Sequence, residues 1–177
     1  RNIDVEFVLC DGLLSGCLEK SITYKSAAEQ SVSTWSAKCP DCFYRGAARF
    51  AAAGIKYHGM SKWVPLAKRA ELRYLADSID TADIEDYQMY GISVGKDALS
   101  GAVRYYKGLD LLEEVNADNE KIVREYFFSS LVSTESAKCA IDEINPDHVV
   151  MSHGIYPMWS GAFSYCLSKG IPVTRWN

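Results

Sequence analysis

A short polar segment near the C-terminus holds the residue types best suited to chemistry. Ser152, His153 and Gly154 directly follow a short apolar run at residues 149–151, and Tyr156 comes soon after. An imidazole titrates near neutral pH, and a glycine beside it lets a ligand approach the backbone. His153 is therefore a candidate catalytic residue, with Ser152, Gly154 and Tyr156 as candidate substrate-binding residues. A loop histidine held by backbone groups is the alternative.

Two further charged residues are candidates for the same site. Asp11 follows a predicted strand at residues 3–9, where a carboxylate could act as a general base on a hydroxyl group. Its alternative role is a local cap, the commoner use of an acidic residue in a turn. Arg104 could bind phosphate through two parallel hydrogen bonds, and a solvated or core-bridging arginine is its alternative. The other two histidines, His58 and His148, are predicted to be structural.

The cysteines allow three interpretations. Four of the six, Cys10, Cys17, Cys39 and Cys42, form two pairs early in the chain and could hold a zinc ion as four thiolates. Alternatively, the run CPDC directly before a predicted helix could be a redox dithiol, because a helix N-terminus lowers the pKa of a thiol such as that of Cys39. Reduced cysteines that simply pack in the interior are the third interpretation. Structural disulfides are not expected, since nothing marks the chain as secreted.

The elements that would position these residues are clearest at the C-terminal end. Residues 149–151 predict a buried strand, residues 159–168 a helix that ends at Lys169 and Gly170, and residues 171–176 a second strand. A strand, helix and strand in succession indicate a parallel sheet, whose ligands bind at the carboxyl ends of the strands. The predicted fold class is α/β, with a Rossmann-like parallel sheet flanked by helices.

The remaining elements are predicted from apolar patterning and from glycine and proline. A helical insertion is expected around residues 64–107, and the longest helix at residues 116–144, where apolar side chains recur with a period of 3.6 and Pro146 follows. The other expectations are a strand at residues 3–9, an irregular segment at 15–38, a helix at 43–53 and a short strand at 55–60.

Length and composition narrow the function classes. A chain of 177 residues suits one domain, and its 19 basic and 23 acidic residues are scattered, unlike the basic stripe of nucleic-acid-binding proteins. No apolar run reaches the roughly 18 residues that span a bilayer. We expect a cytoplasmic protein, peripheral to the inner membrane at most. Because the sequence opens with Arg1 and stops after a predicted strand, we also expect a fragment of a longer protein.

Several segments together resemble a known family. They are FVLCDGLLSGC, CPDC with the following helix that ends in AAAG, SGAVRYYKG and, most specifically, NPDHVVMSHGIYPMWSGAFSYCLSKGIPVT. In this order they resemble the N-terminal domain of bacterial glycosyltransferases of the two-Rossmann-domain (GT-B-like) type, which build capsules, O-antigens and other surface polysaccharides.

The resemblance implies two domains that bind different substrates. The N-terminal domain would bind a saccharide or lipid-linked saccharide acceptor, while a C-terminal domain outside this sequence would bind the nucleotide sugar. His153 and Asp11 would face the cleft between them, with Ser152, Gly154 and Tyr156 shaping it. Family members usually begin with an earlier strand and a glycine-rich loop that often bears the base, so the isolated domain is expected to be inactive.

Two functions of other classes remain open. A thiol-disulfide oxidoreductase would use Cys39 and Cys42, with Pro172 as the proline opposite the dithiol, although the polar residues 31–38 are unlike the apolar strand that normally precedes such a pair. A small zinc-stabilised interaction domain would explain the four early cysteines. Walker, GxGxxG, GxSxG and HExxH motifs are all missing from the sequence.

Overall fold

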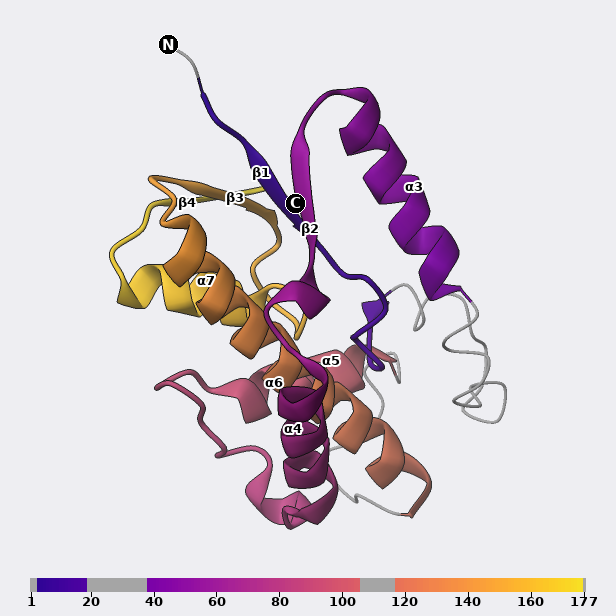
Figure 1. Cartoon of the computed structure of the whole chain (residues 1–177). Coiled ribbons are helices and arrows are strands. Elements are labelled where there is room, and N and C mark those ends of the chain that lie inside the picture. Colours follow the sequence, from indigo (N-terminus) through magenta and orange to yellow (C-terminus); the bar gives the residue numbers. More distant parts are fainter. Residues whose placement is uncertain (1–2, 19–37, 106–116, 177) are drawn as a thin grey trace.

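The computed structural model describes residues 3–18, 38–105 and 117–176, and within them the protein is of the α/β class (Figure 1). Helices predominate over four short parallel strands. The elements in chain order are β1 (Glu6–Leu9), α3 (Cys39–Ala52), β2 (Lys56–Gly59), the 3-10 helix η2 (Met60–Lys62), α4 (Leu66–Ser78), the 3-10 helix η3 (Thr81–Asp83), α5 (Val94–Tyr105), α6 (Ala117–Ile144), β3 (Val149–Ser152), α7 (Ser160–Ser168) and β4 (Val173–Trp176).

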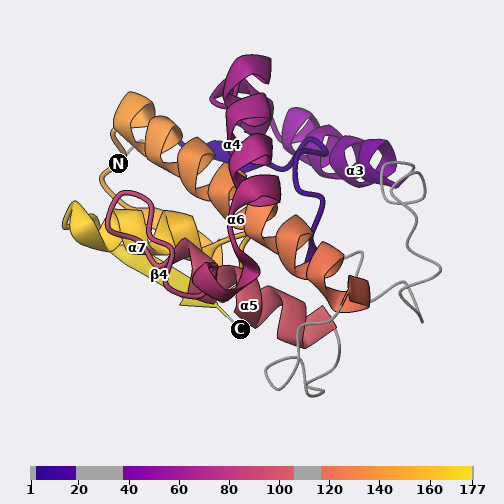
Figure 2. The same ribbon diagram turned by 90° about the horizontal axis from the view of Figure 1, so that it is seen from below.

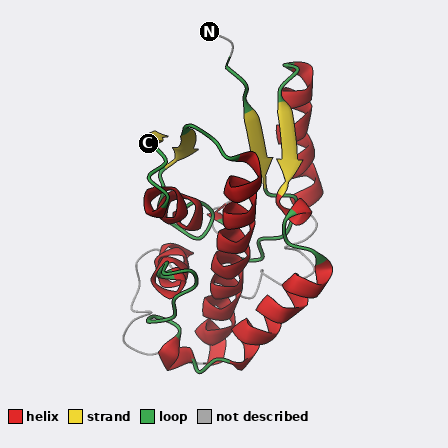
Figure 3. Ribbon diagram, turned by 60° about the vertical axis from the view of Figure 1, so that its left-hand side comes forward, coloured by secondary structure: helices red, strands yellow, loops and turns green. Residues whose placement is uncertain are grey.

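The four strands form two sheets in the described part of the chain, where we expected one. β1 pairs with β2 and β3 with β4, both in parallel, with Glu6 opposite Lys56 and Val149 opposite Val173. Both strand pairs lie toward the end of α6 where that helix finishes (Figure 3). Val150 in the middle of β3 is 62% exposed. The strands are therefore less buried than those of a typical parallel sheet, in which helices cover both faces.

The centre of the protein is α6, a helix of 28 residues and about 42 Å. Every residue from 126 to 136 is buried, because α4, α5 and α7 all pack around this helix (Figure 2). A helix that is buried on all sides belongs to the interior of a protein. The core is therefore built by helices, and the strand pairs lie at its margin. Its largest fully buried side chains include Phe127, Leu131, Val123, Val132, Leu14, Ile84, Val64 and Val94.

The predicted long helices are present in the structure, whereas the start of α3 differs from its prediction. The helix expected at residues 116–144 is α6, which ends where Asn145 adopts a φ of 50° ahead of Pro146. The expected insertion holds α4 and α5. The CPDC run does not precede its helix as predicted, because Cys39 begins α3 and Pro40 is tolerated in the first turn. Most of the segment expected to be irregular lies outside the described residues.

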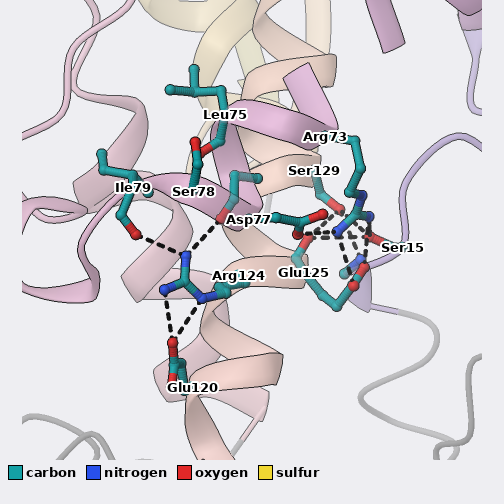
Figure 4. A network of polar contacts seen from close by, with 12 residues as sticks. Ser15, Arg73, Leu75, Asp77, Ser78, Ile79, Glu120, Arg124, Glu125 and Ser129 are labelled. Atoms are coloured by element: carbon teal, nitrogen blue, oxygen red, sulfur yellow. Dashed lines mark hydrogen bonds and ion pairs between the residues drawn. The ribbon is translucent and has the colours of Figure 1, made fainter. Parts of the chain in front are cut away.

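Two arginines fasten α4 to α6 (Figure 4). Arg73 of α4 donates from both terminal nitrogens to the carboxylate of Glu125, at 3.0 and 2.9 Å. Arg124 of α6 donates to the carbonyl oxygens of Ala76 and Ile79, at 2.8 and 2.9 Å. Carbonyls in the last turn of a helix have no partner within it, so Arg124 supplies the cap that α4 lacks.

The segment after β1 is fastened to the same helix. The backbone N–H of Gly16 donates to the Oγ of Ser129 at 2.7 Å, and the Oγ of Ser15 donates to the carbonyl oxygen of Glu125 at 3.2 Å. A Cβ atom built at Gly16 would lie 2.9 Å from the Cα of Tyr126. Only glycine fits there without displacement, so the chain leaving the carboxyl end of β1 runs directly against α6.

Candidate functional site

The loop between β3 and α7 concentrates backbone strain. His153 and Tyr156 have φ angles of 48° and 72°, in the left-handed region that side chains other than glycine seldom adopt. Gly154 has a φ of 73°, and a Cβ atom built there would lie 2.7 Å from the Cδ of Arg175. Left-handed non-glycine residues cost about 1–3 kcal/mol each and cluster at ligand sites. This loop is therefore the strongest candidate for a functional segment.

His153 is held at the rim of the second sheet. Its backbone N–H donates to the carbonyl oxygen of Trp176 at 3.0 Å, and its Nδ1 is hydrogen-bonded to the Oγ of Ser152. The ring stacks on that of Trp159, with centroids 5.5 Å apart. The side chain is partly exposed, and its Nε2 has no hydrogen-bond partner among the described residues. An imidazole held in this way has one nitrogen oriented by the protein and one able to exchange a proton with a ligand.

Tyr156, at the other end of the strained loop, contacts Arg104 from α5. The Nη1 of Arg104 donates to the phenol oxygen at 2.7 Å, and the guanidinium lies 4.9 Å from the ring centroid. Arg104 makes no ion pair with a described residue, so the charge of its guanidinium is not neutralised by a carboxylate there.

One face of α5 runs along this loop. Asp97, Gly101 and Arg104 are spaced by four and then three residues, which places them on the same side of the helix. Arg104 meets Tyr156 as described, and a Cβ atom built at Gly101 would lie 2.8 Å from the Cδ of Pro157.

Asp97 is the third residue on this face of α5, at the end of the helix opposite Arg104. Its carboxyl group lies beside the hydroxyl of Ser160, the first residue of α7. Burial raises the pKa of this carboxyl above its usual value, and the neighbouring hydroxyl only partly opposes that effect. Titratable groups shifted by burial next to a candidate site are themselves functional candidates.

A shallow hollow, whose enclosed part is about the size of one water molecule, lies where α5, α6 and the loops after β1 and β3 meet. We call it the Arg104 hollow. Its walls are mainly apolar and aromatic, and among the described residues that line it Arg104 alone is charged. The residues that line it are Gly16, Cys17, Leu18, Gly101, Arg104, Tyr126, Tyr156, Pro157 and Met158. Its position agrees with the rule that ligands of α/β proteins bind at the carboxyl ends of parallel strands.

The predicted site residues thus fall into separate groups. Arg104 and Tyr156 line the hollow, while Ser152, His153 and Gly154 do not but lie in or beside the same loop. The sixth predicted residue, Asp11, lies elsewhere: its carboxylate accepts hydrogen bonds from the backbone N–H and the Oγ of Ser61 in η2. Asp11 therefore bonds to a residue 50 positions away in the chain, which is neither a place in the loop from Ser152 to Tyr156 nor the cap within its own turn that was the alternative.

The two remaining histidines contact neighbouring strands. The Nε2 of His58 lies 2.7 Å from a carboxylate oxygen of Glu6 across the first strand pair. The Nε2 of His148 lies 2.9 Å from the Oγ1 of Thr174 across the second. Both contacts hold strands together, and neither histidine lines the Arg104 hollow.

The four early cysteines are spread over three elements. Cys39 and Cys42 lie in the first turn of α3, and Cys17 lines the hollow. Cys10 follows β1 near Cys39, and burial raises the pKa of the Cys10 thiol. Across residues 3–18, 38–105 and 117–176, no group of three or more histidine, cysteine, aspartate or glutamate side chains is arranged to hold a metal ion. A zinc site therefore stays a prediction from cysteine spacing.

Sequence reasoning missed two parts of this site. Asp97 could have been found, because it lies seven residues before Arg104 and so on the same helical face. Gly101 could not have been found from the sequence, because nothing in its own segment requires a glycine. Glycine is needed there because Pro157 and Tyr126, from other elements, approach the backbone closely.

The chain was compared with protein-family models, with curated proteins and with solved structures, and none of the three comparisons gave a match. Within the described ranges, no helix combines the length and apolar composition of a transmembrane span.

Proposed function

We propose that this chain is the acceptor-binding domain of a bacterial glycosyltransferase of the two-Rossmann-domain type, acting in surface polysaccharide synthesis. The observation that carries the proposal is the Arg104 hollow at the carboxyl ends of the strands, beside the strained loop from His153 to Tyr156. In this proposal the two strand pairs belong to one Rossmann-like sheet of the whole enzyme. The acceptor is a saccharide or lipid-linked saccharide, and the nucleotide sugar binds to a C-terminal domain.

His153 is the proposed general base. Transfer of a sugar to a hydroxyl group needs a base that removes the hydroxyl proton as the bond to the sugar forms. The Nε2 of His153, which has no hydrogen-bond partner among the described residues, can accept that proton, while Ser152 and Trp159 hold the ring. Asp11 is the weaker candidate because its carboxylate is engaged in the cap of η2. Stabilisation of the leaving diphosphate falls to the second domain.

The test uses the full-length protein that contains this chain together with its C-terminal domain. Sugar-nucleotide turnover is measured for His153→Gln and for the matched control His148→Gln, at the other end of β3. A general base contributes about 10²–10⁴-fold to the rate, so His153→Gln is expected to lower kcat by about that factor while the control stays near the parent value. Full activity of a folded His153→Gln enzyme would remove this residue from the mechanism.

A thiol-disulfide oxidoreductase is the second candidate, favoured by one observation. Cys39 and Cys42 both lie in the first turn of the 14-residue helix α3, with the C-x-x-C spacing that redox dithiols use. Reduction of a model disulfide by the chain, lost in Cys39→Ser and kept in Cys166→Ser, would support this function over transfer. Equal, slow reduction by all three proteins would exclude it.

A further inference from the structure

We infer that Cys10 and Cys39 form a reversible disulfide, which joins the turn after β1 to the first turn of α3. This modification site goes beyond the proposed function, because no step of sugar transfer depends on it. Three observations carry the inference: both cysteines lie against Gly12, the backbone holds the sulfur of Cys10 in place, and helical spacing separates Cys39 from Cys42.

Gly12 is the residue against which both cysteines lie. Its backbone N–H donates to the sulfur of Cys10, and Cys39 is close enough for its charge to act on the Cys10 thiol. A Cβ atom built at Gly12 would lie 3.3 Å from the Cβ and 4.0 Å from the Sγ of Cys39. Gly12 also has a φ of 95°, a backbone conformation that suits glycine. A larger residue would be strained and would press against Cys39, whereas glycine leaves the two thiols as neighbours.

The backbone holds the sulfur of Cys10 in a defined place. The N–H groups of Gly12 and Leu14 both donate to it. Burial raises the pKa of this thiol, and the two hydrogen bonds only partly oppose that effect. Cys10 therefore stays protonated near neutral pH and reacts slowly with an oxidant in solution. Cys39 begins α3 and is partly exposed, so a small disulfide can reach it.

Cys42 is the alternative partner of Cys39, and its place in the helix disfavours it. The two residues are three apart in α3, and the backbone N–H of Cys42 donates to the carbonyl oxygen of Lys38 at 3.0 Å. Residues at this spacing on a regular helix have Cβ atoms about 5–6 Å apart, whereas a disulfide needs about 3.5–4.5 Å. Closing that pair would require the first turn of α3 to open, while the pair with Cys10 leaves the turn hydrogen-bonded.

The oxidant is a low-molecular-weight disulfide such as glutathione disulfide. The Cys39 thiolate attacks one of its sulfur atoms, so that a mixed disulfide forms and one glutathione leaves as its thiolate. Cys10 then loses its proton and attacks the sulfur of Cys39, which releases the second glutathione. Two protein thiols are thus oxidised, one glutathione disulfide is reduced, and the two thiol protons end on the two glutathione molecules.

The test is disulfide mapping of the folded chain. The reduced protein is incubated with glutathione disulfide, its free thiols are blocked with N-ethylmaleimide, and its tryptic peptides are identified by mass spectrometry. Trypsin leaves Cys10 together with Cys17 in one peptide, and Cys39 together with Cys42 in another. Each cysteine of the inferred pair thus has a matched control within its own peptide: Cys17→Ser for Cys10→Ser, and Cys42→Ser for Cys39→Ser.

We expect the two peptides to be cross-linked in the oxidised parent and separated again by dithiothreitol. The cross-link should be lost in Cys10→Ser and in Cys39→Ser, and it should be kept in the two controls. Circular dichroism establishes that each variant is folded. Should Cys10→Ser unfold the chain, Cys10→Ala takes its place, and Cys39→Ser tests the other half of the pair.

Three results would overturn the inference. The first is a cross-link that persists in folded Cys10→Ser or Cys39→Ser. The second is a disulfide between Cys39 and Cys42, lost in Cys42→Ser, which would support the oxidoreductase instead. The third is a folded parent without the cross-link although glutathione has been added to its exposed Cys42. Sugar transfer enters none of these results, so failure of the glycosyltransferase proposal leaves the disulfide standing, and failure of the disulfide leaves the glycosyltransferase.

Discussion

Gly101 of α5 lies against Pro157 of the loop between β3 and α7, and a Cβ atom at Gly101 would be 2.8 Å from the Cδ of Pro157 and 2.5 Å from the Cδ1 of Tyr126. Real Cβ atoms do not approach other carbons so closely. The contact joins a helix and a loop that are more than fifty residues apart in the chain. It also fixes the distance between the two walls of the Arg104 hollow.

Gly101→Ala is therefore expected to destabilise the protein. Overpacking of a tight contact costs about 1–3 kcal/mol, which outweighs the gain of up to about 1 kcal/mol from replacing a helical glycine by alanine. Chemical denaturation measures the difference. Gly46→Ala in α3 is the matched control, because its Cβ would lie 3.7 Å from Leu9 in ordinary contact, and it should be neutral or stabilising. Equal effects of the two changes would contradict the tight contact.

Asp97→Asn is expected to stabilise the protein at neutral pH. Burial raises the pKa of Asp97 in the folded state, so the folded protein binds a proton more readily than the unfolded chain does. The ionised carboxylate therefore costs stability, and that cost grows as the pH rises from the usual aspartate pKa through the raised one. The variant does not titrate, so its advantage in thermal unfolding should be present at pH 7 and should shrink toward pH 4. An advantage that is independent of pH would show that ionisation is not its cause.

The Arg73–Glu125 pair should contribute measurably to stability. Both hydrogen bonds are well formed, the two side chains are 31% and 15% exposed, and the guanidinium lies 3.7 Å from the ring centroid of Phe128. A double-mutant cycle with Arg73→Gln and Glu125→Gln should give a coupling energy of about 1–2 kcal/mol, between the values for surface and buried pairs.

The exposed pair between Arg45 and Asp41 provides the comparison. Its side chains are 74% and 64% exposed at an N–O distance of 2.8 Å. A cycle on this pair should give less than about 0.5 kcal/mol. Similar coupling energies for the two pairs would mean that the partial burial of Arg73 and Glu125 contributes nothing.

The cysteines should differ in their rates of alkylation. Cys42 is exposed on α3, whereas Cys166 is fully buried and burial raises the pKa of its thiol. Reaction of the folded, reduced protein with iodoacetamide, followed by mass spectrometry, should modify Cys42 first and Cys166 last. A zinc site would change this order, because Cys10, Cys17, Cys39 and Cys42 would then be protected together until a chelator is added.

Much of the secondary structure could be predicted because its signals are local. The apolar period of residues 122–144 and the proline at position 146 defined α6 almost to the residue. The short apolar run before Ser152 located β3. The CPDC run was placed too early, since a proline is compatible both with the approach to a helix and with its first turn.

The pairing of strands and the composition of the hollow could not be predicted in the same way. Which strands meet depends on how helices pack, and α6 occupies the centre that we expected a sheet to hold. Arg104 and Tyr156 were each identified from the sequence, yet only the three-dimensional structure brings them together, across 52 positions. Asp97 was overlooked, although its spacing of seven residues from Arg104 places both on one face of α5.

The attachment of the N-terminal segment to α6 constrains how the chain acquires its structure. The bonds from Ser15 and Gly16 close loops of 110 and 113 residues, and contacts so distant form slowly. During synthesis, the first strand leaves the ribosome long before the helix that must receive its following turn. The segment that holds Ser15 and Gly16 therefore stays without its contacts to α6 until that helix is synthesised. During this time it can bind chaperones or collapse onto α3.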